Sequence, residues 1–288
     1  MLRLSRCVLA VLAVGIIATA AGASAPEHEG CQLDDSETQR VAAVLASGTS
    51  TSYRGTILVE YSGKREFVAV EESGASGQLV LRHLNRTANA ESEIRRVNTL
   101  PTRTPCLLGN FYGFSLDTGQ TVAGRDTYRL SVRPKDTLRL GYVMDVDHAT
   151  DVPLRVLTLT PEGQMVERFE FAEFEPIAKT PSSAPERESV QASSMRFALS
   201  ALPPGFSVIN SGVTPVEHWL LSDGLATMSV YVEPRSQGVK PGEGVVVRGA
   251  TLTYTKGTLE HALVTVVGEV PVTTARLVAE AVRSREGL

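Results

Sequence analysis

Residues 202–206 of this chain read Leu-Pro-Pro-Gly-Phe, and residues 216–233 read Val-Glu-His-Trp-Leu-Leu-Ser-Asp-Gly-Leu-Ala-Thr-Met-Ser-Val-Tyr-Val-Glu. A Pro-Pro-Gly corner thus precedes two apolar runs, which meet at Ser222-Asp223-Gly224. An Asp-Gly pair supplies the positive φ angles that a tight hairpin turn requires. This tract therefore predicts two antiparallel strands that are joined by a turn at Asp223 and Gly224.

The hairpin belongs to a predicted C-terminal domain, residues 195–288. Its last strand is expected at 263–267, where the chain reads Leu-Val-Thr-Val-Val. A helix is predicted to follow, capped by Thr273 or Thr274 and ending at Ser284. The residues at helical spacing that we expect to be buried are Leu277, Val278, Ala281 and Val282.

Upstream of this domain the apolar pattern stops. Residues 176–194 contain Pro176, Pro181 and Pro185, several serines and scattered charges. Such a composition is typical of a linker. We therefore expect two domains that are separated by residues 176–194.

The first domain is predicted to span residues 31–175. Acidic residues followed by apolar ones at helical spacing predict an amphipathic helix at 34–47. Apolar residues then alternate with polar ones in period two, as at Ile57, Val59 and Tyr61, which is typical of strands. Later strands are expected at 128–132, 138–146, 154–160 and 166–174. Such an antiparallel meander must bury its apolar face against a helix or by curling into an open barrel.

The N-terminus has the features of a secretory signal peptide. Arg3 and Arg6 precede an apolar run that ends at Ala21, and Ala21-Gly22-Ala23 or Ala23-Ser24-Ala25 fits a cleavage site. Cleavage is expected after Ala23, so that residues 1–23 are removed. The alternative is an uncleaved membrane anchor, but the run falls short of the roughly 20 residues that span a bilayer.

Composition narrows the classes of function. Apolar residues make up 42% of the chain, which is enough for a packed core. Removal of the signal would leave 26 basic residues against 32 acidic ones, a net charge of −6. Binding to nucleic acid requires a concentrated basic surface, so nucleic acid is not expected as the main partner.

Two cysteines, Cys31 and Cys106, would remain after cleavage of the signal. Export places them in a compartment that permits oxidation, so we expect a disulfide between them. The alternative is two free thiols. No Cys-x-x-Cys pair is present, and a thiol oxidoreductase is therefore not expected.

No pattern in the chain predicts a metal centre or a cofactor. The five histidines are far apart, and none lies in a ligand-spaced motif. Asp145, Asp147, His148 and Asp151 are grouped closely enough to hold a cation, although a solvated hairpin rim is the preferred interpretation. Gly242-Glu243-Gly244 is expected in a loop with no helix after it, which does not suit a phosphate site.

Residue types that are found in enzyme active sites lie close together in the predicted hairpin. His218, Ser222 and Asp223 are the residue types of a hydrolase triad, but the serine lacks the strand-turn-helix elbow of such enzymes. Sequence neighbours seldom have triad geometry. Asp223 and Gly224 are therefore interpreted as turn residues, and the protein is not expected to be an enzyme.

Two non-catalytic surfaces remain. One is the inner face of the first sheet, which either lines an apolar cavity or forms an ordinary filled core. The other surrounds Trp219, next to His218 and Tyr231, since Trp and Tyr are enriched at the energetic centres of protein interfaces. The alternative for Trp219 is simple packing in the core.

The chain resembles the RseB/MucB family of periplasmic regulators of envelope stress. The resemblance is strongest in the C-terminal half, at the Leu-Pro-Pro-Gly-Phe tract, at Glu217-His218, at residues 222–225 and at residues 268–271 (Gly-Glu-Val-Pro). Weaker matches lie at residues 53–56, 123–125, 134–136, 140–142 and 167–171. Residues 85–110 depart from the family, which carries a Gly-Pro-rich acidic stretch before a basic one.

This resemblance implies an α+β fold in two parts. The N-terminal part would be an open antiparallel half-barrel with helices, similar to the LolA/LolB lipoprotein carriers, and a smaller α+β domain would follow. The resemblance also implies a soluble periplasmic protein that binds the periplasmic region of a membrane anti-sigma factor, RseA-like or MucA-like, and protects it from regulated proteolysis. Lipid or lipopolysaccharide would act as the signal, and self-association is left open.

The resemblance assigns residues to these two roles. It assigns contact with the anti-sigma factor to four residues of the C-terminal domain, His218, Trp219, Asp223 and Tyr231. Lipid contact falls inside the N-terminal sheet, at Ile57, Val59, Tyr61, Leu81, Leu140, Tyr142 and Phe169. No cofactor is expected. The alternative function is a periplasmic carrier of lipids or lipoproteins of the LolA type.

Overall fold

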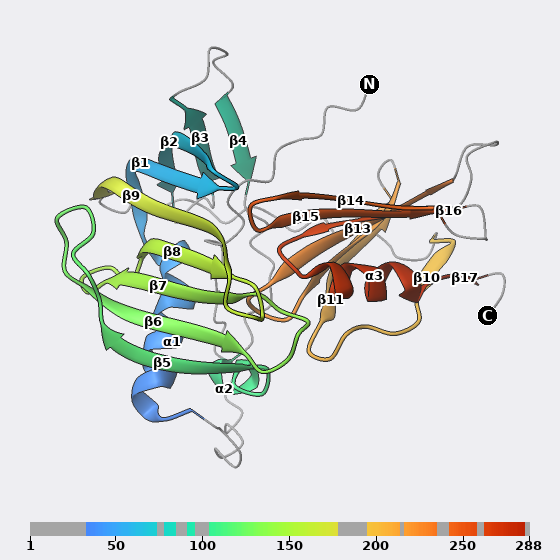
Figure 1. Ribbon diagram of the computed structural model, residues 1–288, viewed down its shortest axis with the longest axis horizontal. Coiled ribbons are helices and arrows are strands. Elements are labelled where there is room, and N and C mark those ends of the chain that lie inside the picture. The colour runs from blue at the N-terminus through green and yellow to red at the C-terminus, as the bar shows by residue number, and fades with distance from the viewer. Residues whose placement is uncertain are drawn as a thin grey trace, which may run out of the picture. The chain divides into compact units, whose positions relative to one another are not determined.

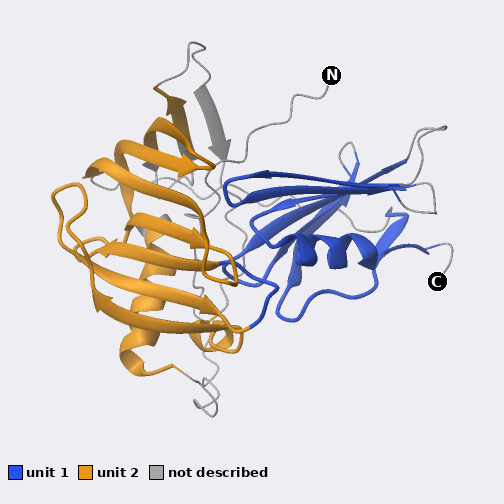
Figure 2. Cartoon of the chain, viewed as in Figure 1, with its two compact units in different colours: residues 1–11, 136–140, 187–288 blue, residues 12–135, 141–186 orange. Residues whose placement is uncertain are grey.

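The computed structural model describes residues 33–73, 78–84, 91–95, 104–177, 195–213, 216–234, 242–257 and 262–285. The predicted signal peptide, Cys31 and most of the predicted linker lie outside these residues. The described part of the chain divides into two compact units (Figure 2). One contains residues 33–135 and 141–177, and the other contains residues 136–140 and 195–285.

The first unit is built on a nine-stranded antiparallel sheet (Figure 1). Its order is β4-β3-β2-β1-β9-β8-β7-β6-β5, so that β4 and β5 form the two edges and the sheet is open. Its helices and strands are α1 (Asp35–Ser50), β1 (Ser52–Tyr61), β2 (Lys64–Ser73), β3 (Gln78–His83), β4 (Glu91–Arg95), α2 (Pro105–Leu108), β5 (Tyr112–Thr118), β6 (Thr127–Pro134), β7 (Gly141–Asp147), β8 (Pro153–Leu159) and β9 (Met165–Ile177).

Helix α1 begins where the acidic residues predicted it. The Asp34 side chain accepts a hydrogen bond from the Glu37 backbone N–H at 2.7 Å, which caps the helix. The Arg40 guanidinium lies 4.5 Å from the centroid of the Tyr128 ring and donates to Asp151. These contacts hold α1 against β6 and against the loop between β7 and β8.

Local sequence suits the tight turn between β1 and β2 and the close contact between β1 and β9. Ser62 and Gly63 both have positive φ, 47° and 72°, which suits the tight turn between β1 and β2. At Gly55, β1 passes so close to β9 that an added Cβ would lie 2.1 Å from the Glu173 carbonyl oxygen. The register of β1 against β9 shifts beside this contact, between Thr56 and Ile57. Glycine is therefore required at residue 55, where the two paired backbones come this close.

The second unit is a six-stranded antiparallel sheet with one helix on one face (Figure 1). Its order is β11-β12-β13-β16-β15-β14. Its elements are β10 (Phe197–Leu199), β11 (Ser207–Val213), β12 (Glu217–Ser222), β13 (Thr227–Pro234), β14 (Glu243–Arg248), β15 (Thr251–Gly257), β16 (Ala262–Gly268), α3 (Val272–Ala281) and β17 (Val282–Ser284). Strands β10 and β17 form a separate antiparallel pair.

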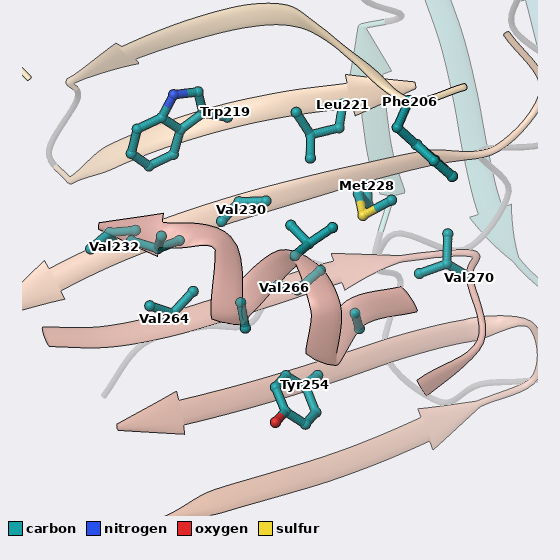
Figure 3. Close-up of a cluster of buried hydrophobic side chains, with 14 of the residues drawn as sticks. Phe206, Trp219, Leu221, Met228, Val230, Val232, Tyr254, Val264, Val266 and Val270 are labelled. Carbon is teal, nitrogen blue, oxygen red and sulfur yellow. The ribbon is translucent and has the colours of Figure 1, made fainter. Parts of the chain in front are cut away.

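The hydrophobic core of this unit lies between the sheet and α3 (Figure 3). Trp219 and Leu221 of β12, Met228 and Val230 of β13, and Tyr254 of β15 all contribute buried side chains. From α3, the buried residues include Thr274, Ala275, Val278 and Ala279. Burial of a large apolar side chain stabilises by about 1.5–3 kcal/mol, so this cluster holds the helix on the sheet.

The structure confirms the α+β class and the open antiparallel half-barrel, as well as the hairpin at Ser222-Asp223-Gly224. Several local predictions were wrong. The cap of α3 is Pro271, without a side-chain hydrogen bond, and not a threonine. Leu277 is exposed, because the helix turns its other side to the sheet. Helix α3 ends at Ala281, where the chain becomes extended and Val282 enters β17.

Two strand boundaries also differ from prediction. Strand β7 begins at Gly141 and not at Leu138, because residues 136–140 belong to the second compact unit. Glu243 and Gly244, expected in a loop, are the first residues of strand β14.

The domain boundaries 31–175 and 195–288 stay a prediction. Among the described residues, no helix combines the length and the apolar character that a bilayer crossing requires.

Candidate functional site

The turn between β12 and β13 is built by side chains. Asp223 Oδ1 accepts from the backbone N–H groups of Leu225 and Ala226, at 3.0 and 2.8 Å. Ser222 Oγ donates to the Ala226 carbonyl and accepts from the Gly224 N–H, both at 2.9 Å. Gly224 has a φ of 104°, while Asp223 does not adopt a positive φ. Both side chains form hydrogen bonds within the turn, and Asp223 is a turn residue as predicted.

The other carboxylate oxygen of Asp223 accepts from a buried arginine. Arg139 Nε lies 2.8 Å from Asp223 Oδ2, and neither side chain is exposed to solvent. Arg139 also donates to the Asp136 carboxylate and to the Pro204 carbonyl, and its guanidinium carbon lies 5.3 Å from the centroid of the Phe206 ring. A buried guanidinium must have its donors satisfied, and these partners do so.

Three tracts that carry the family resemblance therefore meet at one side chain. Asp136 ends the Pro-Lys-Asp tract, Pro204 and Phe206 belong to the Leu-Pro-Pro-Gly-Phe tract, and Asp223 belongs to the hairpin turn. The Leu138 carbonyl also accepts from Thr274 Oγ1 of α3 at 2.7 Å. Residues 136–140 are thus fastened to the six-stranded sheet and its helix, within one compact unit. The sequence did not single out Arg139, because nothing in its surroundings marks a buried guanidinium.

The four residues assigned to partner contact lie in two different environments. Trp219 is 5% exposed and packs in the core on the α3 side of the sheet (Figure 3). Asp223 is buried against Arg139. Strand alternation places His218 and Tyr231 on the opposite face, where they are paired across β12 and β13 with ring centroids 6.4 Å apart. The assignment of all four to the partner stays a prediction.

The face that carries His218 and Tyr231 has no helix over it in the described part of the second unit. The strand register places Tyr231 opposite Thr265, and Thr265 opposite Thr255. The two threonine hydroxyls are 3.3 Å apart. Tyr231 is 39% exposed and is the largest exposed aromatic of this row. We call the surface formed by His218, Leu220, Ser229, Tyr231 and Thr265 the open face of the C-terminal sheet.

Six of the seven residues assigned to lipid contact share the inner face of the N-terminal sheet. The register places Phe169 opposite Val59 and links Leu81 through Val70 to β1. All six are buried: Ile57, Val59, Tyr61, Leu81, Tyr142 and Phe169. Leu140 is also buried, but it precedes β7 and belongs to the second unit. Lipid contact itself stays a prediction.

Polar groups interrupt this apolar face. The Tyr61 hydroxyl donates to Glu66 Oε1 at 2.6 Å, and His83 Nδ1 lies 3.4 Å from Glu66 Oε2. All three side chains are buried. Glu66 was not predicted on this face. Buried carboxylates are stable only with partners, and Tyr61 and His83 supply them.

A pocket of about 480 Å³ opens on the sheet near β1, β2 and β9. Most of its lining comes from the face opposite to Ile57 and Val59. Its charged residues are Arg54, Glu71, Arg82, Glu173 and Glu175. Arg54 and Glu175 form an ion pair at 2.8 Å, and both are well exposed. None of the seven predicted lipid residues lines this pocket.

Two of the acidic residues at the end of β7 do not lie on a solvated rim as predicted, although His148 beside them is exposed. Asp145 and Asp147 are buried, and arginines neutralise them: Asp145 pairs with Arg129 and Arg155, and Asp147 pairs with Arg125 at 2.8 Å. Burial alone would raise the pKa of the Asp147 carboxyl, but hydrogen bonds from Arg125 and Thr150 hold it below its usual value. No metal-binding cluster of side chains occurs among the residues that the structure describes.

Cys106 lies in the short helix α2 and is disulfide-bonded. Cys31, its expected partner, lies outside the described residues, so the pairing of Cys31 with Cys106 stays a prediction.

Known protein families and relatives match most of the chain. A model of the MucB/RseB N-terminal domain matches residues 76–192, and a model of the MucB/RseB C-terminal domain matches residues 191–283. The sigma factor AlgU regulatory protein MucB of Pseudomonas aeruginosa is 28% identical over 280 residues, which cover 81% of this chain and 86% of the relative. The sigma-E factor regulatory protein RseB of Salmonella typhimurium is 28% identical over 200 residues, which cover 62% of this chain and 61% of the relative.

A solved structure of the Pseudomonas aeruginosa MucA/MucB complex is also similar. The match has a TM-score of 0.66 and 28% sequence identity, and it covers 86% of this chain and 99% of that chain.

Proposed function

This chain belongs to the MucB/RseB family, and on that basis we propose that it binds the periplasmic region of a membrane anti-sigma factor of the MucA or RseA type and protects it from regulated proteolysis. The observation that carries the proposal is the pair of family models, which together span residues 76–283. The solved complex of the relative MucB with MucA supports the choice of partner. The protein acts by binding and not by catalysis.

The signal-like N-terminus supports a periplasmic location. Arg3, Arg6 and the apolar run up to Ala21 fit Sec-type export, and cleavage after Ala23 releases the protein into the periplasm. The anti-sigma factor would present its periplasmic region in the same compartment.

We place the partner on the open face of the C-terminal sheet. Tyr231 offers an exposed aromatic surface, and His218 beside it offers a hydrogen-bonding ring. Aromatic side chains at such positions often contribute most of the binding energy of an interface. Trp219 supports this surface from the core side of β12, and Asp223 fixes the turn that ends the strand. Their contributions to binding are therefore indirect.

We place the lipid signal at the inner face of the N-terminal sheet. A lipid that releases nearly all of the bound anti-sigma factor must bind the partner-free protein more favourably than the partner-bound protein, by roughly 5 kcal/mol. Burial of six to eight methylenes, at about 0.8 kcal/mol each, is of that order. An acyl chain must displace packed side chains such as Ile57 and Phe169, because these are buried in the absence of ligand.

Calorimetry of the mature chain with the periplasmic tail of the anti-sigma factor tests the binding. We expect saturable binding, and we expect the bound tail to resist a protease that cleaves it when it is free. Added lipopolysaccharide should weaken the binding. If the chain instead extracts lipids or lipoproteins from membranes and has no affinity for the tail, the carrier function replaces this proposal.

A further inference from the structure

The pocket of the N-terminal sheet lies outside both surfaces that the proposed function uses. Its lining includes two small residues that the register sets side by side, Ala69 of β2 and Thr56 of β1. The same row continues to Arg82 of β3 on one side and to Glu173 of β9 on the other. Strands β3, β2, β1 and β9 are neighbours in the sheet (Figure 1). A cation and a carboxylate therefore stand at the two ends of a row of small side chains.

Both of these charged groups can meet a ligand. Glu173 is exposed, and its carboxylate accepts from Thr56 Oγ1 at 3.3 Å, which leaves further acceptor sites open. Arg82 is exposed and takes part in no ion pair among the side chains that the structure describes. Its guanidinium has five N–H donors, so donors remain for a ligand even beside Glu91, the residue opposite Arg82 in β4.

The rows on either side of this one differ in character. On one side, Arg54 stands between Glu71 and Glu175, and it pairs with Glu175 at 2.8 Å. On the other side, Phe67 of β2 stands opposite Leu58 of β1 and is 41% exposed. A ligand that lies along the row between Arg82 and Glu173 would thus have charged groups on one flank and apolar side chains on the other.

We propose that this pocket binds a free tripeptide by its two charged ends, with the ammonium group on Glu173 and the carboxylate on Arg82. Arginine suits the second role, because its guanidinium donates two parallel hydrogen bonds to a carboxylate. A ligand with a single charge would leave one end of the row without a partner. A central apolar side chain of the peptide lies against Phe67.

The dimensions of the pocket fit this ligand. Neighbouring strands are about 4.8 Å apart, so the three steps from Arg82 to Glu173 span about 14 Å. An extended tripeptide is about 10 Å long, and a hydrogen-bonded contact adds about 2.8 Å at each end. The pocket volume of about 480 Å³ lies within the roughly 300–1,000 Å³ of small-molecule sites.

Isothermal titration of the mature chain with the peptide Ala-Leu-Ala at low ionic strength tests the site. We expect saturable binding that weakens as salt is added, because exposed charges are screened. Acetylation of the peptide N-terminus or amidation of its C-terminus should each raise the dissociation constant at least about tenfold. Each modification removes one hydrogen-bonded contact between charged groups.

Two variants test which residue holds which end of the peptide. Arg82→Gln should bind the free and the amidated peptide equally but should still discriminate against the acetylated one. Glu173→Gln should show the reverse selectivity. Both residues are exposed, so the thermal unfolding of both variants should match that of the native chain.

Arg65→Gln and Glu170→Gln are the matched controls. Arg65 lies in β2 and Glu170 lies in β9, and neither residue lines the pocket. Both controls should keep the selectivity of the native chain. A native chain that does not bind Ala-Leu-Ala, or that binds the free and the blocked peptides equally, would overturn the proposal. So would equal losses of affinity in Arg65→Gln and Arg82→Gln, because binding would then depend on net charge alone.

Discussion

Arg139 and Asp223 form an ion pair that is excluded from solvent, although the two residues are 84 positions apart in the sequence. Arg139 lies in the segment between β6 and β7, and Asp223 lies in the turn between β12 and β13. The pair joins residues 136–140 to the C-terminal sheet within one compact unit. Removal of either partner would leave the other as an uncompensated buried charge.

Arg139→Ala should therefore lower the free energy of unfolding by about 3–5 kcal/mol, as measured by urea denaturation. Arg139→Lys should recover little of the loss, because an ammonium cannot reproduce the planar set of donors that meets Asp136, Pro204 and Asp223. The exposed ion pair of Arg54 with Glu175 supplies the control, and Arg54→Ala should cost less than about 1 kcal/mol. Equal losses for Arg139→Ala and Arg54→Ala would contradict this account.

The two faces of the C-terminal sheet should respond differently to substitution. Trp219→Ala removes a core side chain and should cost about 3–5 kcal/mol of stability. Tyr231→Ala lies on the open face and should leave stability within about 1 kcal/mol while it weakens tail binding at least about tenfold. Paired calorimetry and denaturation of both variants separate the two effects. Unchanged tail affinity in Tyr231→Ala would remove the open face from the interface.

Gly55→Ala should destabilise the N-terminal sheet by at least about 2 kcal/mol, because the added Cβ would lie 2.1 Å from the Glu173 carbonyl oxygen. Gly113→Ala is the matched control, since this strand glycine has a nearest contact of 4.0 Å at its Cβ position. Thermal unfolding of the two variants gives the comparison. Similar midpoints for both would show that β1 and β9 can separate at little cost.

The ion pair of Asp147 with Arg125 should make stability depend on pH. The pKa of Asp147 is lowered in the folded state, so the unfolded chain binds its proton more tightly. The pair therefore stabilises the protein above the unfolded pKa of about 3.9, and this contribution is lost as the pH falls through the lower folded pKa. Asp147→Asn should be less stable than the native chain at pH 7, and the difference should shrink below about pH 4. A difference that is constant across this range would contradict the assignment.

Much of the architecture was predictable because period-two alternation and turn residues are local signals. Ile57, Val59 and Tyr61 share a buried face as expected, and Asp223 with Gly224 forms the expected turn. Arg139 was missed because its burial depends on partners from Pro204 and Asp223, which are distant in sequence. For the same reason, Asp145 and Asp147 were interpreted as parts of a solvated rim, although Arg129 of β6 pairs with Asp145 and Arg125, just before β6, pairs with Asp147.

The candidate site was less predictable than the fold. Sequence alone grouped His218 with Trp219, yet adjacent residues of a strand point to opposite faces, and only the sheet shows which face the helix covers. Strand β14 was missed because Gly242 and Gly244 resemble a loop. Its exposure follows from its place at the edge of the sheet, which no local pattern encodes.

In the function that we propose, this chain binds the periplasmic tail of an anti-sigma factor through the open face of its C-terminal sheet. The most direct test is isothermal titration of the purified mature chain with that tail, alongside the Tyr231→Ala variant. We expect saturable binding by the native chain and at least about tenfold weaker binding by a correctly folded variant. A native chain that releases no heat and protects no part of the tail from proteolysis would contradict it.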